Sequence, residues 1–103
     1  MVLIKGAKIV DGSGNKSPYV ADVLLTDGKI SAIGKFPTKK TNVVIDGLGL
    51  HLVPGFIDVN TDSDHHLSLF TNPEQQDFLK QGVTTIFGGM CGSSLAPLLH
   101  GTL

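Results

Sequence analysis

The sequence predicts a mixed β and α/β fold, in which a half made of short strands is followed by a strand, a helix and a second strand. Three observations support this prediction. Apolar runs separated by dense turn signals fill residues 1–53, an Asp27-Gly28 pair lies between two of these runs, and two further β-type runs flank a helical segment after residue 53. The hydrophobic content of 41% is that of a globular protein.

The first half is expected to form short strands over residues 2–10, 21–26, 29–33, 42–46 and 50–53. Between the first two, residues 11–18 contain two glycines and a proline, which are typical of turns. Asp27-Gly28 suits a type I′ turn, because both central residues of that turn need a positive φ. This pair therefore predicts a β-hairpin.

Residues 53–57 are expected to form a buried strand that ends abruptly in polar residues. In parallel α/β folds, polar side chains at the carboxyl end of a strand are where sites are built. Side chains alternate along a strand, so Asp58, Asn60 and Asp62 are expected on one side, with Val59 and Thr61 on the other.

A helix and a second strand are expected to follow. Asn72 is the predicted N-cap, Pro73 the first helical residue, and Gly82 the residue that ends the helix. Residues 83–87 are rich in β-branched side chains and predict the second strand. Strand, helix and strand form a βαβ unit, so the two strands should be parallel, with residues 58–64 and 88–92 on the same rim.

Composition limits the classes of function. The net charge of −1 gives no electrostatic reason to expect nucleic acid or membrane as a partner. Cys91 is the only cysteine, so an internal disulfide is excluded and a reducing compartment is expected. The sequence has no signal-peptide pattern and no run of 18 apolar residues, which predicts a cytoplasmic location.

Residues 53–59, Val-Pro-Gly-Phe-Ile-Asp-Val, resemble the signature of the metal-dependent amidohydrolase superfamily. In that superfamily the signature begins the first strand of a (β/α)8 TIM barrel and is followed by His-x-His. Residues 81–85 and 90–98 resemble the N-acyl-D-amino-acid deacylase (D-aminoacylase) branch. The resemblance implies that residues 1–53 are part of a small β-sandwich and residues 54–103 the start of the barrel. Because such a barrel needs roughly 250 residues, the chain is expected to be an N-terminal fragment.

The resemblance implies zinc as the cofactor and a small-molecule amide as the substrate. Cys91 matches a metal-ligating cysteine of the branch, and Asn60 and Asp62 stand where the family has its two histidines. An amide is a poor zinc ligand and a carboxylate a harder one than imidazole, so Asn60 is the weaker candidate. The alternatives are a small buried cysteine, a solvated or capping aspartate, and a hydrogen-bonding asparagine.

Two further carboxylates are expected to support the site. Asp58 matches the aspartate that precedes His-x-His in the family, and we expect it to form hydrogen bonds within the strand end and to orient its neighbours. Asp64 is followed by His65 and His66, but adjacent side chains in a strand point in opposite directions. Both histidines are therefore expected to be loop residues rather than ligands of one metal.

Three hypotheses of function follow. The first is the N-terminal portion of an amidohydrolase that hydrolyses an amide bond, inactive as a fragment because no catalytic residue is expected within residues 1–103. The second is a non-catalytic scaffold or binding protein that has lost its histidine ligands, and the third is a truncated product without function. Because later strands complete the β-sandwich in the family, the isolated chain is expected to self-associate through open sheet edges.

Overall fold

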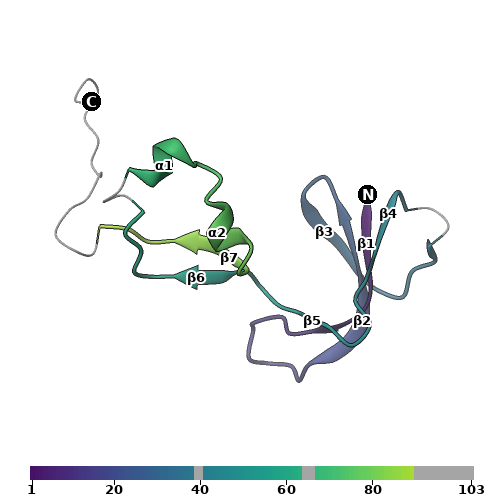
Figure 1. The fold of residues 1–103 in the computed structure, drawn as a ribbon. Helices are drawn as coiled ribbons and strands as arrows, with labels where there is room; N and C mark the ends of the chain where they lie inside the picture. The colour runs from purple at the N-terminus through teal and green to yellow at the C-terminus, as the bar shows by residue number, and fades with distance from the viewer. Residues whose placement is uncertain (39–40, 64–66, 90–103) are drawn as a thin grey trace. The chain divides into compact units, whose positions relative to one another are not determined.

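A computed structural model describes residues 1–38, 41–63 and 67–89 of the chain (Figure 1). The chain divides into two compact units, Met1–Pro54 and Gly55–Leu103. The first unit is built from strands, and the described part of the second contains two short strands and two single-turn helices. The mixed fold predicted from the sequence is confirmed. The assignment of residues 1–53 and 54–103 to two types of domain stays a prediction.

The first unit is a single five-stranded sheet. Its strands are β1 (Val2–Ile9), β2 (Tyr19–Thr26), β3 (Lys29–Gly34), β4 (Val43–Asp46) and β5 (His51–Leu52). The order is β3-β2-β1-β4, and β5 pairs with β1 beside β4. Pairing is antiparallel from β1 to β3, whereas β4 and β5 run parallel to β1. The sheet is therefore mixed, with β1 at its centre.

The hairpin between β2 and β3 forms as predicted. Thr26 pairs with Lys29, which leaves Asp27 and Gly28 as a two-residue loop. The φ angles of these two residues are 53° and 73°. Both angles are positive, as a type I′ turn requires, so the predicted turn chemistry is confirmed.

An irregularity in the middle of β1 separates the part of its edge that pairs with β4 from the part that pairs with β5. The pairing of β1 with β2 shifts between Ile4 and Ala7, and Gly6 between them has a φ of 70°. The chain passes from β4 to β5 through Gly47, whose N–H donates to the Lys5 carbonyl at 2.8 Å. Gly47 is buried, so this crossing is a close approach of two backbones.

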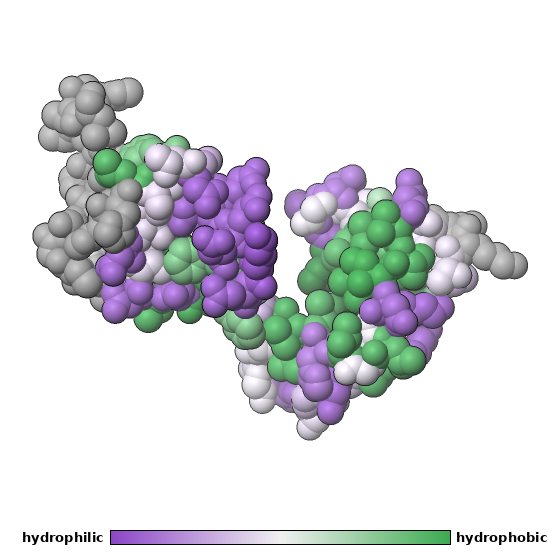
Figure 2. Space-filling model, viewed as in Figure 1, coloured by the Kyte–Doolittle hydropathy of each residue, from purple (hydrophilic) through white to green (hydrophobic). Residues whose placement is uncertain are grey.

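One face of this sheet is apolar and only partly covered. We call the apolar face the surface formed by Ile4, Ile9, Val23, Leu25, Ile30, Ile33 and Leu52. Val23 is 2% exposed, but Ile30 and Ile33 are 64% and 45% exposed. Figure 2 shows hydrophobic side chains gathered over the strands of this unit. Within the described residues of the first unit, no helix or second sheet packs on the apolar face.

The second unit contains β6 (Phe56–Asp58), α1 (Ser68–Thr71), α2 (Gln76–Leu79) and β7 (Val83–Ile86). As predicted, the two strands are parallel and are separated in the chain by the helical segment. Within the described ranges, no helix has the length and apolar character that crossing a membrane requires.

The strand predicted over residues 53–57 is shorter and more exposed than expected. It begins only at Phe56, and the exposed fractions of Phe56 and Ile57 are 57% and 61%. The prediction of a buried strand is therefore wrong for this chain. A parallel strand is buried only where both faces of its sheet are covered, and a two-stranded sheet with two single-turn helices does not provide that cover.

The predicted helix is shortened to the single turn α2, and another single turn, α1, lies before the predicted start. Asn72 ends α1 instead of capping a following helix, and its N–H donates to the Ser68 carbonyl at 2.8 Å. Pro73 disfavours helical geometry at the residue before it, and the φ of 46° at Gln75 interrupts the chain again before α2. Gly82 has a φ of 83° and ends this segment, as predicted.

Candidate functional site

The predicted site residues that the structure describes follow β6 directly. Asp58 is the last residue of the strand and is half-buried, whereas Asn60 and Asp62 are exposed. Asp64 and Cys91 lie outside the described residues. The described part of the candidate site is therefore the segment 58–63 and the neighbouring end of β7.

The chain forms a bulge just after β6 ends at Asp58, in addition to the register shift between Phe56 and Ile57 within the β6–β7 pair. The Phe87 N–H donates to the Asp58 carbonyl at 2.8 Å, and the Thr61 N–H donates to the Phe87 carbonyl at 3.1 Å. In a regular parallel ladder the second bond would come from Asn60, two residues after Asp58. One extra residue is therefore inserted on this strand, which is the definition of a β-bulge.

The Asp58 side chain compensates for the bulge. Its Oδ1 accepts the Asn60 N–H at 3.0 Å, so the backbone donor that the ladder leaves out still has a partner. This is the hydrogen bond within the strand end that the sequence predicts for Asp58. The role of Asp58 in supporting a metal site stays a prediction.

Burial alternates after the bulge, but not as the sequence suggests. Thr61 and Ser63 are 4% and 8% exposed, while Asn60 and Asp62 are exposed. Asn60 and Asp62 therefore share the outer side, as expected. Val59 does not share the burial of Thr61, because it is 63% exposed. Strict alternation fails there, since β6 ends at Asp58 and the extra residue breaks the period.

Both ends of this segment are fixed by backbone carbonyls. Phe87 accepts two hydrogen bonds from Thr61, from its N–H at 3.1 Å and from its Oγ1 at 3.3 Å. At the other end, the Ser63 carbonyl accepts the N–H of Ser68 at 3.0 Å and its Oγ at 2.9 Å. Thr61 and Ser63 were not candidates in the sequence because neither stands at a ligand position of the family or has a carboxylate, imidazole or thiol. The sequence did hold one sign of their burial: Thr61 and Ser63 alternate with the strongly polar Asn60 and Asp62.

The described residues do not by themselves form a zinc site. Nowhere in the described ranges do three His, Cys, Asp or Glu side chains come together in a way that could hold a metal ion. Asp58 is engaged by the Asn60 N–H. The exposed side chains of Asn60 and Asp62 are then the nearest potential metal ligands. Both would offer oxygen, whereas zinc prefers nitrogen and sulfur.

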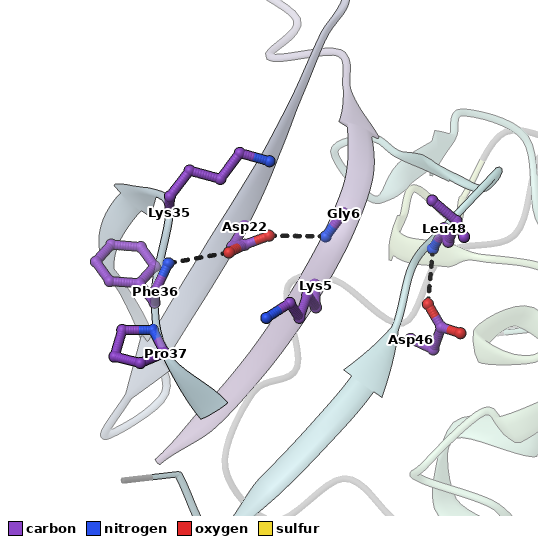
Figure 3. Close-up of a pocket in the computed structure, with 8 residues that line it drawn as sticks. All are labelled: Lys5, Gly6, Asp22, Lys35, Phe36, Pro37, Asp46 and Leu48. Carbon is purple, nitrogen blue, oxygen red and sulfur yellow. Dashed lines mark hydrogen bonds between the residues drawn. The ribbon is translucent and has the colours of Figure 1, made fainter. Parts of the chain in front are cut away.

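A second polar cluster lies in the first unit, where Asp22 lines a hollow with Lys5 and Lys35 (Figure 3). Asp22 is 2% exposed and accepts two backbone N–H groups, from Gly6 at 2.9 Å and from Phe36 at 3.0 Å. The Phe36 N–H and then the Gly6 N–H hold the pKa of Asp22 below its ordinary value. Both carboxylate oxygens are therefore used to join β1 to the segment after β3, which is a structural role.

Comparison with known proteins identifies relatives of this chain, although no family model matches it. The chain is 42% identical over 96 residues to N-acyl-D-aspartate deacylase from Alcaligenes xylosoxydans xylosoxydans, a match that covers 93% of this chain and 19% of the relative. The crystal structure of N-acyl-D-glutamate deacylase from Bordetella bronchiseptica, in complex with zinc and a phosphonate inhibitor, matches with a TM-score of 0.80 and 36% identity. That match covers 93% of this chain and 20% of the other.

A D-aminoacylase structure, which defined a subset of the amidohydrolases, matches with a TM-score of 0.76 and 33% identity over 99% of this chain and 21% of the other. Sequence and fold together show that the chain is homologous to amidohydrolases over the matched stretch. Its relatives include N-acyl-D-amino-acid deacylases, the branch that the sequence resembles, and also dihydroorotases. The chain spans about a fifth of the length of the relatives that it matches.

Proposed function

We propose that this chain supplies the first part of the active-site rim of a metal-dependent amidohydrolase that hydrolyses the amide bond of an N-acyl-D-amino acid. One observation carries the proposal. In a chain whose homologues are deacylases, the ends of β6 and β7 are joined by hydrogen bonds, and Asn60 and Asp62 are exposed beside that junction. Such a position at the carboxyl ends of parallel strands is where barrel enzymes build their sites.

The described residues would contribute polar contacts to a substrate. The Asn60 side chain can donate and accept hydrogen bonds, so it can pair with a carboxylate or an amide carbonyl. The Asp62 carboxylate only accepts when ionised, and therefore suits an amide N–H. Zinc is the proposed cofactor, with Cys91 and Asp62 as proposed ligands and Asn60 as a weaker one. A cytoplasmic location and inactivity of the isolated fragment belong to the same proposal.

The test is the zinc content of the longest form of the protein that can be expressed. We expect stoichiometric zinc in the unmodified protein and its loss in Cys91→Ala, because a thiolate is among the strongest zinc ligands. Asp62→Asn should lower the zinc content as well. Asp77→Asn, which changes an exposed carboxylate on α2, is the matched control and should change nothing. Elemental analysis measures all four proteins.

A second candidate function is a non-catalytic scaffold, which Asn60 and Asp62 favour because they replace the histidines of the family. The Asn60→His, Asp62→His double variant separates the two candidates. Zinc that appears only after both histidines are restored would contradict the enzyme proposal and support the scaffold. Zinc in the unmodified protein, with hydrolysis of an N-acetyl-D-amino acid, would contradict the scaffold.

We propose further that the 103-residue chain, made alone, self-associates through the apolar face. Burial of Ile30 and Ile33 against a second copy would remove apolar area from water. Ile33→Lys is expected to shift the chain toward monomer in sedimentation velocity measured over about a hundredfold range of concentration. Val20→Lys is the matched control, since Val20 is 57% exposed on the opposite face beside Lys8. Equal effects of the two variants would refute association through the apolar face.

A further inference from the structure

We propose that Thr61 is a positioning residue that selects the register in which Asn60 and Asp62 face outward at the rim. This inference rests on the proposed function for its purpose, but its evidence is the geometry of the strand end. Thr61 is 4% exposed and directs both its N–H and its Oγ1 to one acceptor, the Phe87 carbonyl. Phe87 in turn donates its N–H to the Asp58 carbonyl at 2.8 Å.

Two registers compete for the Phe87 carbonyl. In the regular ladder it would accept the Asn60 N–H, and in the observed bulge it accepts the Thr61 N–H at 3.1 Å. A shift of one residue turns each side chain to the opposite side of a strand. The regular register would therefore turn Asn60 and Asp62 inward and Thr61 outward. Bulges beside active sites are used in this way to aim side chains.

The two side chains that flank the bulge both favour the observed register. The Asp58 carboxylate holds the Asn60 N–H at 3.0 Å, away from the ladder. The Thr61 hydroxyl donates a second hydrogen bond, at 3.3 Å, to the Phe87 carbonyl, which in the bulge already accepts the Thr61 N–H. Removing the Asp58 carboxylate or the Thr61 hydroxyl takes away a hydrogen bond that exists only in the bulged register. The same change removes no hydrogen bond from the regular register, so the balance shifts toward it.

A purely structural role makes a different prediction. If Thr61 serves only as a buried β-branched residue, valine should replace it without effect, because the two side chains have the same shape. If the hydroxyl selects the register, serine should preserve the function and valine should not. Thr85, an exposed threonine on β7, supplies the matched control Thr85→Val.

The experiment uses the longest expressible form that carries Asn60→His and Asp62→His, with zinc alone as the probe. In this background Thr61→Val is expected to weaken zinc binding roughly 10- to 100-fold, the range typical of residues that orient ligands. Thr61→Ser and Thr85→Val are expected to stay within about threefold of the parent. A competition titration with a chromogenic chelator measures the affinities. Equal zinc affinity in Thr61→Val and Thr61→Ser would overturn the proposal.

A second measurement needs no metal and keeps the inference separate from the proposed function. Amide hydrogen exchange followed by NMR should show faster exchange of the Thr61 N–H in Thr61→Val, while the β7 amides exchange as before. Asp58→Ala provides a second variant and should also speed exchange of the Thr61 N–H, because the regular register gives the Phe87 carbonyl to Asn60 instead. If the unmodified protein binds no zinc, the proposed function fails but the exchange rates still decide the role of Thr61. Unchanged exchange in both variants would refute that role.

Discussion

Replacing Gly47 by alanine is expected to lower the free energy of unfolding by about 2–3 kcal/mol, near the upper end of the cost of overpacking a core. A Cβ at this position would lie 2.8 Å from the Ala7 Cβ and 3.0 Å from the Lys5 carbonyl oxygen. Both atoms belong to β1, at the centre of the sheet, so neither can move without disturbing its pairing. Urea unfolding at low protein concentration, followed by circular dichroism, measures the change.

Two further variants show whether close packing is the cause. Ala7→Gly removes one of the two obstructing atoms and should restore part of the stability of Gly47→Ala. Gly14→Ala is a control, because a Cβ there meets nothing within 4 Å although φ is 71°. That control should cost about 1–2 kcal/mol from backbone conformation alone. A loss no larger in Gly47→Ala than in Gly14→Ala would show that the crossing of the chain over β1 tolerates a side chain.

Replacing Asp22 by alanine is expected to be the most destabilising change of a polar residue in the first unit. The substitution leaves the N–H groups of Gly6 and Phe36 without their carboxylate acceptor. The expected fall in Tm is roughly 5–15 °C, and Asp22→Asn, which keeps one acceptor oxygen, should lose less. Asp11→Ala is the comparison, since the Asp11 carboxylate forms hydrogen bonds only within an exposed turn, to Ser13.

The contribution of Asp22 should also depend on pH. The Phe36 and Gly6 N–H groups, with a smaller effect of Lys35 and Lys5, lower the pKa of Asp22 in the folded state. The unfolded chain therefore binds this proton more readily than the folded one, and stability falls as the pH falls. The contribution is complete above the ordinary carboxyl pKa of about 3.9 and is lost as the pH drops through the lowered folded value.

Thermal melts of the wild type and Asp22→Ala between about pH 7 and pH 2 test this dependence. Their Tm values should differ most above about pH 5 and converge at the acidic end. A difference in Tm that stays constant over the whole range would show that the charge of Asp22 does not stabilise the fold.

Local signals in the sequence were sufficient where a few neighbouring residues determine the structure. Asp27-Gly28 specifies its turn because positive φ at both positions is a property of the residues themselves. The parallel pairing of β6 and β7 follows from the strand, helix and strand order. The resemblance of residues 53–59 also pointed to the proteins that are found as homologues, since that motif is contiguous in the chain.

Features that depend on distant partners could not be predicted. The burial of Asp22 depends on Phe36, 14 residues away, and the pairing of Thr61 depends on Phe87, 26 residues away. The expected helix was shortened for a more local reason, because the positive φ of 46° at Gln75 breaks the segment after Asn72 and Pro73, and α2 begins only at Gln76. At the candidate site, the positions of the family's metal ligands predict roles for Asn60 and Asp62. They predict none for Thr61, which lies between them.

The central position of β1 has a consequence for how the chain is made. β2 and β3 are adjacent in the chain and can pair as soon as both have been synthesised. β1 is synthesised first, yet Val2 pairs with Val43 and Ile9 with Leu52. On the ribosome, the edge of β1 that receives β4 and β5 therefore stays without these partners until translation has passed residue 52. β1 is the first strand of this unit in chain order, and its pairing is complete only when β5, the last strand of the unit, has been made.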